Sequence, residues 1–89
     1  MSPFALKVYK VVLNIPFGEV RTYRWVAEKA GHPGAWRAVG RILKNNPLPL
    51  IIPCHRVICS DKDLGGYIWG RKIKKLLINY ERKLKELMV

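Results

Sequence analysis

The sequence predicts a small, mostly α-helical domain of the winged helix-turn-helix class, with a short β-hairpin as the wing. At 89 residues the chain has room for one hydrophobic core, so we expect a single domain over residues 1–89. Apolar residues recur at helical spacing in several segments, and a short turn containing Gly joins the second segment to the third. Two short apolar runs around a polar turn then predict the hairpin.

The first predicted helix begins at Ser2-Pro3, because Ser can cap a helix and Pro suits its first turn. The segment Asn-Ile-Pro-Phe-Gly at residues 14–18 ends it. Apolar residues at helical spacing form the expected core-facing side, namely Phe4, Val8, Val11, Val12 and Ile15.

The next two helices form the predicted helix-turn-helix, over about residues 22–45. Thr22 can cap a helix of about residues 23–30, which ends at Gly31 and Pro33. The third helix covers about residues 35–45. Its buried face is marked by Ala35, Ala38, Val39 and Ile42.

The charge balance predicts a polyanionic partner. The chain has 17 Lys and Arg against 6 Asp and Glu, which gives a net charge of +11. Arg37, Arg41 and Lys44 share the exposed face of the third helix. A solvated charged face is the usual meaning of such a run, but the second helix of a helix-turn-helix normally enters a nucleic-acid groove. Charge alone does not separate DNA from RNA, and a basic surface that only confers solubility, or one that adsorbs to membranes, stays open.

The rest of the chain predicts the wing and a last helix. Pro47 and Pro49 break the chain, and the Leu-Ile-Ile run at residues 50–52 predicts a short buried strand or extended segment. Residues 57–59 and 67–69 flank a polar turn and predict the hairpin. The last helix covers about residues 71–87 and carries Lys74 and Glu81 on one side. Its inward-packing residues are expected to be Ile73, Leu76, Leu77, Tyr80 and Leu87.

The segment Pro53-Cys54-His55-Arg56-Val57 places a thiol beside an imidazole. The thiolate is the nucleophilic form of Cys, and a nearby base or positive charge raises its share. A nucleophile on a helix-turn-helix scaffold predicts chemistry on DNA, although buried, inert Cys and His side chains are the alternative. Cys59 has no base beside it and is expected to be structural, and His32 lies in a predicted turn. The Cys and His spacing fits no zinc motif, so we predict no metal site.

Several stretches together resemble the C-terminal, active-site domain of the O6-alkylguanine-DNA alkyltransferases. The resemblance covers about residues 3–81. It implies direct transfer of an alkyl group from O6-alkylguanine in double-stranded DNA to the protein, once per chain and without a cofactor. The matching stretches are residues 17–20, 22–23, 37–40, 45–47, 50–58, 65–67 and 74–81.

The resemblance also implies a role for each matching residue. Cys54 would accept the alkyl group, His55 would act as general base through a water, and Glu81 would orient His55. The alternative for Glu81 is a helix-surface ion pair with Lys85. The remaining roles in the chemistry fall to Asn46 as a hydrogen-bonding link, Tyr67 as donor to the leaving guanine and Lys74 as charge support.

On the DNA side, the resemblance implies that Tyr23 presses on the backbone and that Arg37 fills the gap left by a nucleotide rotated out of the stack. The expected DNA-binding set is Thr22, Tyr23, Arg37, Gly40, Arg41 and Lys44.

Two alternative functions stay open. Alkyltransferase-like proteins bind alkylated DNA without repairing it, and they usually have Trp where this chain has Cys54. A helix-turn-helix regulator would bind undamaged DNA sequence-selectively. Ile68-Trp69 replaces the small residues that often follow the family tyrosine, so the rim of the alkyl pocket is expected to differ. Most family members carry an additional N-terminal domain, whereas this chain starts at the active-site domain.

The sequence predicts where the protein works. Its N-terminus lacks a basic leader followed by an apolar core, and its longest apolar run is too short to span a bilayer. We therefore expect a monomeric cytoplasmic protein with no membrane partner.

Overall fold

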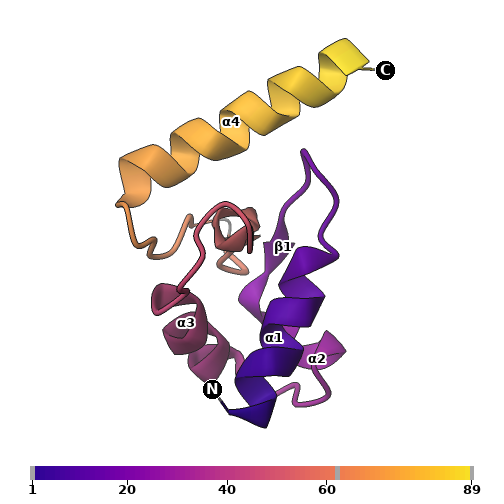
Figure 1. Ribbon diagram of the computed structural model, residues 1–89, viewed down its shortest axis with the longest axis vertical. Coiled ribbons are helices and arrows are strands. Elements are labelled where there is room, and N and C mark those ends of the chain that lie inside the picture. The colour runs from indigo at the N-terminus through magenta and orange to yellow at the C-terminus, as the bar shows by residue number, and fades with distance from the viewer. Residues whose placement is uncertain (1, 62, 89) are drawn as a thin grey trace.

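Four α-helices and a two-stranded sheet make up the computed structural model, which describes residues 2–61 and 63–88 (Figure 1). The mostly α-helical fold class predicted from the sequence is confirmed. The helices are α1 (Pro3–Leu13), α2 (Tyr23–Lys29), α3 (Trp36–Lys44) and α4 (Arg71–Met88). A 3₁₀-helix, η1 (Cys54–Arg56), and two short strands, β1 (Arg21–Thr22) and β2 (Val57–Ile58), complete the fold.

The predicted N-terminal caps of α1 and α2 both form. The Ser2 hydroxyl oxygen accepts a hydrogen bond from the Ala5 backbone N–H at 3.1 Å, and the Thr22 hydroxyl oxygen accepts one from Trp25 at 3.0 Å. Each bond satisfies a backbone donor that the first helical turn leaves free. The caps fix where α1 and α2 begin.

The core lies among α1, α2 and α3. Val8, Val12 and Ile15 are buried as predicted, while Phe4 and Val11 are partly buried and pack against the core. From the helix-turn-helix, the buried side chains are Val26, Ala27, Ala30, Val39 and Leu43. Leu43 was not predicted, and Ala35, Ala38 and Ile42 are only half-buried.

The predicted β-hairpin is wrong. β2 pairs with β1 in parallel, with Arg21 opposite Val57 and Thr22 opposite Ile58, and residues 67–69 form no strand. Gly65 and Gly70 take positive φ values of 72° and 90° on either side of this run, so the chain turns there. The edge of β2 is filled by a segment that lies far away in the sequence.

The segment before η1 also differs from the prediction. Residues 50–51 lie in an exposed turn, where Leu50 adopts a positive φ of 75°, and only Ile52 of the three residues is buried. The turn closes through a hydrogen bond from the Ile52 N–H to the Leu48 carbonyl at 2.9 Å. It brings the chain from the end of α3 to the start of η1.

The predicted inward face of α4 is wrong. Ile73, Leu76, Tyr80 and Leu87 are exposed and Leu77 is half-buried, whereas Lys74 and Ile78 are buried. Helix α4 lies across one end of the domain over η1 (Figure 1). It presents polar side chains inward because they find hydrogen-bond partners there. In the part of the chain that the structure describes, none of the helices has both the length and the apolar character that a bilayer crossing needs.

Candidate active site

Cys54 begins η1 at the edge of a groove of about 600 Å³. The side chain is buried, with 4% of its surface exposed. The groove is bordered by α2, α3 and part of the segment that follows β2. Several predicted site residues line it together with Cys54, namely Tyr23, Arg37, Gly40, Arg41 and Lys44. The structure therefore brings the predicted nucleophile and most of the predicted DNA-binding residues to one concave surface.

Asn46 connects the end of α3 to the Cys54 thiol. Its buried amide nitrogen donates to Cys54 Sγ at 3.2 Å and to the Ile52 carbonyl at 2.9 Å. Its oxygen accepts from the Leu48 N–H at 2.9 Å, so the amide orientation is fixed from both ends. The predicted linking position of Asn46 is the one that the structure shows.

Burial raises the pKa of the Cys54 thiol, and the hydrogen bond from Asn46 and the charge of Lys74 offset this only in part. The resting side chain is therefore a neutral thiol, and a base must remove its proton before it acts as a nucleophile. The N–H donor from Asn46 favours the thiolate once it forms.

His55 lies next to Cys54 and is 1% exposed. Its Nε2 lies 2.6 Å from Glu81 Oε2. An ionised carboxylate only accepts hydrogen bonds, so Nε2 carries the proton and Nδ1 keeps a free lone pair. Within the described residues, Nδ1 is buried without a hydrogen-bond partner.

The pKa of His55 is lowered, because burial outweighs the hydrogen bond and charge of Glu81. The ring is therefore neutral near physiological pH, and Nδ1 can accept a proton there.

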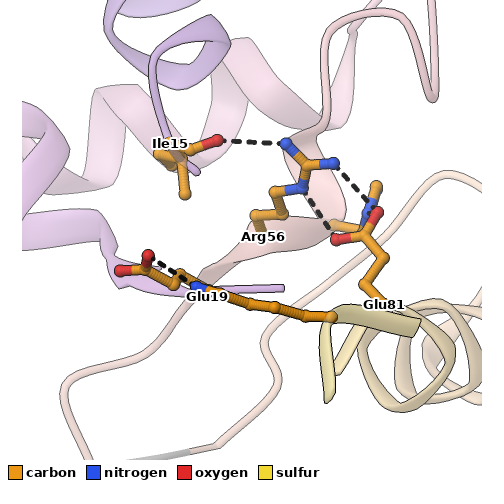
Figure 2. A network of polar contacts seen from close by, with 6 residues as sticks. Ile15, Glu19, Arg56 and Glu81 are labelled. Atoms are coloured by element: carbon orange, nitrogen blue, oxygen red, sulfur yellow. Dashed lines mark hydrogen bonds and ion pairs between the residues drawn. The ribbon is translucent and has the colours of Figure 1, made fainter. Parts of the chain in front are cut away.

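Glu81 is held by Arg56 as well as by His55. Arg56 donates from Nε to Glu81 Oε1 at 2.8 Å and from Nη2 to Oε2 at 3.1 Å, while its Nη1 donates to the Ile15 carbonyl at 3.0 Å (Figure 2). Burial raises the pKa of Glu81, but the hydrogen bonds from Arg56 and His55 outweigh burial and leave it lowered. Glu81 is thus a carboxylate bridging α4 and η1.

Arg56 is a site residue that sequence reasoning missed. The motif predicts no role for Arg56, but a half-buried Arg directly after a buried Cys-His pair needs a carboxylate or carbonyl partner. Its guanidinium also lies over the Phe17 ring, 5.5 Å from the centroid. That position, between the α1–β1 turn and α4, makes Arg56 a positioning residue for Glu81.

A second ion pair fastens α4 to the same turn. Lys85 Nζ lies 3.0 Å from Glu19 Oε2, and Arg21 binds the other carboxylate oxygen at 2.8 Å. Figure 2 shows the ion pair of Glu19 in the same view as the Arg56–Glu81 contact. The alternative pair of Glu81 with Lys85 does not form, since each of them has other partners.

Tyr67 lies edge-on to His55, with 6.3 Å between the ring centroids. Its hydroxyl is buried and has no hydrogen-bond partner within the described residues. Burial raises the pKa of Tyr67 to about 12, so the hydroxyl stays protonated and can donate. The Trp69 ring also packs edge-on to Tyr67, with 5.9 Å between the two ring centroids.

Lys74 and Glu81 both point from α4 into the domain, on the one side of the helix where the sequence placed them, but they have different partners. Lys74 Nζ donates to the Gly66 carbonyl at 3.2 Å and to the Tyr23 hydroxyl at 3.4 Å. Burial lowers the pKa of Lys74 to about 8. Gly65 lies so close to Tyr23 that an added Cβ would sit 2.7 Å from its hydroxyl, so Lys74 and Tyr23 together support the loop that carries Tyr67.

The basic side of the groove is built on α2 and α3. The guanidinium groups of Arg24 and Arg37 lie over the Trp36 ring, 5.5 Å and 5.1 Å from its centroid. Arg24 and Trp36 line the groove and were not predicted as site residues, because the contact between them joins two helices and leaves no local signal in the sequence. The predicted DNA-binding residue Thr22 is not among the residues that line the groove. Its hydroxyl caps α2 instead.

The two Cys residues border the same groove, and both are free thiols. Cys59 is half-buried and Cys54 is buried. In the described stretches 2–61 and 63–88, no group of three or more His, Cys, Asp and Glu side chains is placed to hold a metal ion.

The Arg56 contacts predict a specific loss of stability on a conservative change. Arg56→Lys keeps the charge but cannot donate two parallel hydrogen bonds to Glu81 and a third to Ile15. We expect it to lower the free energy of unfolding by about 1.5–3 kcal/mol in urea denaturation. Arg82→Lys, on the exposed side of α4, is the matched control and should stay within about 0.5 kcal/mol of the parent. Equal stability of the two variants would contradict a stabilising role for the hydrogen bonds of Arg56 to Glu81 and Ile15.

The pKa of His55 predicts how stability depends on pH. The folded state resists protonation of His55, so the unfolded chain binds the proton first as the pH falls below about 6.5, and folding stability decreases. Glu81, with a lowered pKa, adds to the same loss at lower pH. Thermal unfolding across this range should show a steep fall for the parent and a shallower one for His55→Gln. The control His32→Asn, at an exposed site, should follow the parent. If the three proteins lose stability equally as the pH falls, His55 is not the source of the pH dependence.

Comparison with known proteins gives the family. Residues 3–83 match the family model described as 6-O-methylguanine DNA methyltransferase, DNA binding domain. A methylated-DNA–protein-cysteine methyltransferase of Methanosarcina barkeri is 49% identical over 80 residues, which are 90% of this chain and 51% of the relative. This chain therefore spans about half the length of that curated relative.

Two solved structures extend the likeness to three dimensions. Mycobacterium tuberculosis OGT in complex with DNA matches with a TM-score of 0.91 and 42% identity, over 93% of this chain and 52% of that one. S. pombe Atl1, in complex with damaged DNA containing O6-carboxymethylguanine, matches with a TM-score of 0.80 and 34% identity, over 91% of this chain and 77% of that one. The family resemblance seen in the sequence is confirmed: the chain belongs to the 6-O-methylguanine DNA methyltransferase family, as its DNA-binding domain.

Proposed function

We propose that this domain binds double-stranded DNA containing O6-alkylguanine and repairs it by moving the alkyl group to Cys54, once per chain. The observation that carries the proposal is a single groove bordered by Cys54 and by the basic residues of α2 and α3. Behind Cys54 lies a neutral His55 held by an ionised Glu81. This combination fits a nucleophile that is activated after a basic surface has docked on DNA.

Access to the damaged base requires the nucleotide to leave the stack, because an O6 substituent is buried in the duplex. Flipping costs a few kcal/mol, so a side chain must occupy the vacated space. Arg37 lines the groove, is exposed, and has the length for this role. Tyr23 lines the same groove and is held by Lys74, and in this proposal it presses on the DNA backbone as the nucleotide rotates.

The proposed chemistry balances without a cofactor or metal. The Cys54 proton passes through a water to His55 Nδ1, and the thiolate attacks the alkyl carbon. A sulfur–carbon bond forms while the carbon–O6 bond breaks, and its electron pair stays on the guanine. Tyr67 stabilises the leaving guanine by donating a hydrogen bond or proton from its hydroxyl. The thioether has no hydrolytic exit, so the reaction stops after one turnover.

Asn46 and Lys74 assist without touching the alkyl group. Asn46 donates to Cys54 Sγ and so stabilises the thiolate, while the positive charge of Lys74 acts in the same direction. In this proposal Lys74 also holds the Gly66 carbonyl, which precedes Tyr67.

With DNA as the partner, we place the protein in the cytoplasm as a monomer.

Recognition of alkylated DNA without repair is the second candidate function. It is favoured by the match to S. pombe Atl1, of which this chain covers 77%. Cys54 argues for transfer, because a binding module needs no activated thiol. The two candidates differ in one measurable respect, which is whether a sulfur–carbon bond forms.

The transfer reaction predicts a stoichiometry. Mixed with excess duplex containing O6-methylguanine, the parent should gain one methyl group per chain, at Cys54, as read by intact and peptide mass. Cys54→Ser should gain none and should still bind the duplex, whereas Cys59→Ser, in the same groove, should react like the parent. Binding without any mass gain would select the recognition module, and methyl removal beyond one equivalent would refute the single-turnover scheme.

The flipping role predicts that Arg37 matters only in duplex DNA. Arg37→Ala should slow methyl removal from duplex by about 10-fold or more, since an unfilled gap lets the base return, at a cost of a few kcal/mol. Reaction with free O6-benzylguanine needs no flipping and should be nearly unchanged. Arg82→Ala, on exposed α4, is the control for lost charge. Equal losses on both substrates would exclude a plug.

A further inference from the structure

Helix α4 carries a continuous apolar stripe that faces away from the domain. Its members, hereafter the α4 stripe, have exposed fractions between 42% and 80%. Single exposed apolar residues are common on protein surfaces, but a continuous row on one helix is not. The α4 stripe consists of Ile73, Leu76, Tyr80, Leu84 and Leu87.

The spacing of the stripe suits a second helix. Ile73, Tyr80 and Leu87 recur every seven residues, and Leu76 and Leu84 fill the positions between them. A seven-residue apolar repeat presents one seam to a partner helix that packs nearly parallel or antiparallel to it. The opposite side of α4 is already occupied, because Lys74 and Ile78 are buried against the domain. The stripe is therefore free for a partner along much of α4.

Charge selects the chemistry of that partner. Lys72, Lys75 and Lys83 line a shallow groove beside Leu76 and Tyr80. All three Lys side chains are exposed, and within the described residues none of them forms an ion pair. A second copy of this chain would bring the same positive charges, on a protein whose net charge is already +11. A partner with acidic residues beside its apolar side complements the groove.

The α4 stripe is separate from the candidate active site. The groove at Cys54 is bordered by α2, α3 and the segment after β2, and none of the stripe residues lines it. Figure 1 shows α4 at the end of the domain away from α2, with α3 below it on the other side of the 3₁₀ segment. A helix can therefore dock on α4 while DNA occupies α2 and α3.

We propose that the α4 stripe docks an amphipathic helix of another protein, whose apolar side is flanked by Asp and Glu. This interaction surface goes beyond the proposed repair reaction and does not depend on it. Helix-in-groove recognition of this kind uses apolar anchors at heptad spacing for affinity and flanking charges for partner choice.

The test uses a synthetic helical peptide of about three heptads, with Leu at the apolar positions and Glu beside them, and a matched peptide with Lys in place of Glu. Isothermal titration should show that the 89-residue protein binds the acidic peptide at least about tenfold more tightly than the basic one. The double variant Leu76→Ser/Tyr80→Ser should lose that binding by a similar factor. Lys72→Glu/Lys83→Glu should reverse the preference toward the basic peptide.

The control variant Leu13→Ser changes an apolar side chain on α1 that is 51% exposed, and it should bind like the parent. Because all substituted residues are exposed, circular dichroism should show native helix content for every variant. Three results would each overturn the proposal. They are equal binding of both peptides, concentration-dependent dimers in sedimentation that the Leu76→Ser/Tyr80→Ser change abolishes, and stripe-dependent binding to phosphatidylserine vesicles with no peptide binding.

Discussion

The carboxylate of Glu81 is the group on which the candidate site depends. It accepts from Arg56 at 2.8 Å and lies 2.6 Å from His55 Nε2, so one side chain of α4 fixes two neighbours in η1. The contact with His55 decides which ring nitrogen carries the proton and leaves Nδ1 free. The contact with Arg56 keeps Glu81 ionised and ties both to the Ile15 carbonyl at the end of α1. Without these hydrogen bonds, turning the polar side of α4 inward would bury Glu81 without partners.

Around this contact, three parts of the chain that are far apart in sequence meet at one groove. The β1–β2 pairing places the start of α2, with Tyr23, beside the end of η1. Asn46, just after α3, donates a hydrogen bond to the Cys54 thiol. The elements proposed to dock on DNA and those proposed to react are thus joined by the β1–β2 pairing and by the hydrogen bonds of Asn46. This coupling supports a reaction in which the nucleophile acts only on a base delivered by α2 and α3.

Much of this architecture could be predicted from the sequence, because caps, turns and apolar periods are local signals. Ser2 and Thr22 mark helix starts that the structure confirms. The motif at residues 53–57 singled out Cys54 and His55 for their chemistry, and the structure adds that both are buried. The parallel pairing of β1 with β2 could not be predicted, since nothing in a two-residue strand specifies a distant partner. The apolar period of α4 pointed to the wrong face, because burial of Lys74 and Glu81 is decided by their partners in other segments.

The protonation state of His55 tests the account most directly. Nitrogen-15 spectra of the imidazole near neutral pH should show a neutral ring with the proton on Nε2 and an unprotonated Nδ1, as the contact with Glu81 requires. Glu81→Gln should disturb that state, because it replaces the carboxylate that fixes the tautomer. A doubly protonated ring at neutral pH, or a proton on Nδ1, would contradict the claim that Glu81 prepares His55 to receive the Cys54 proton.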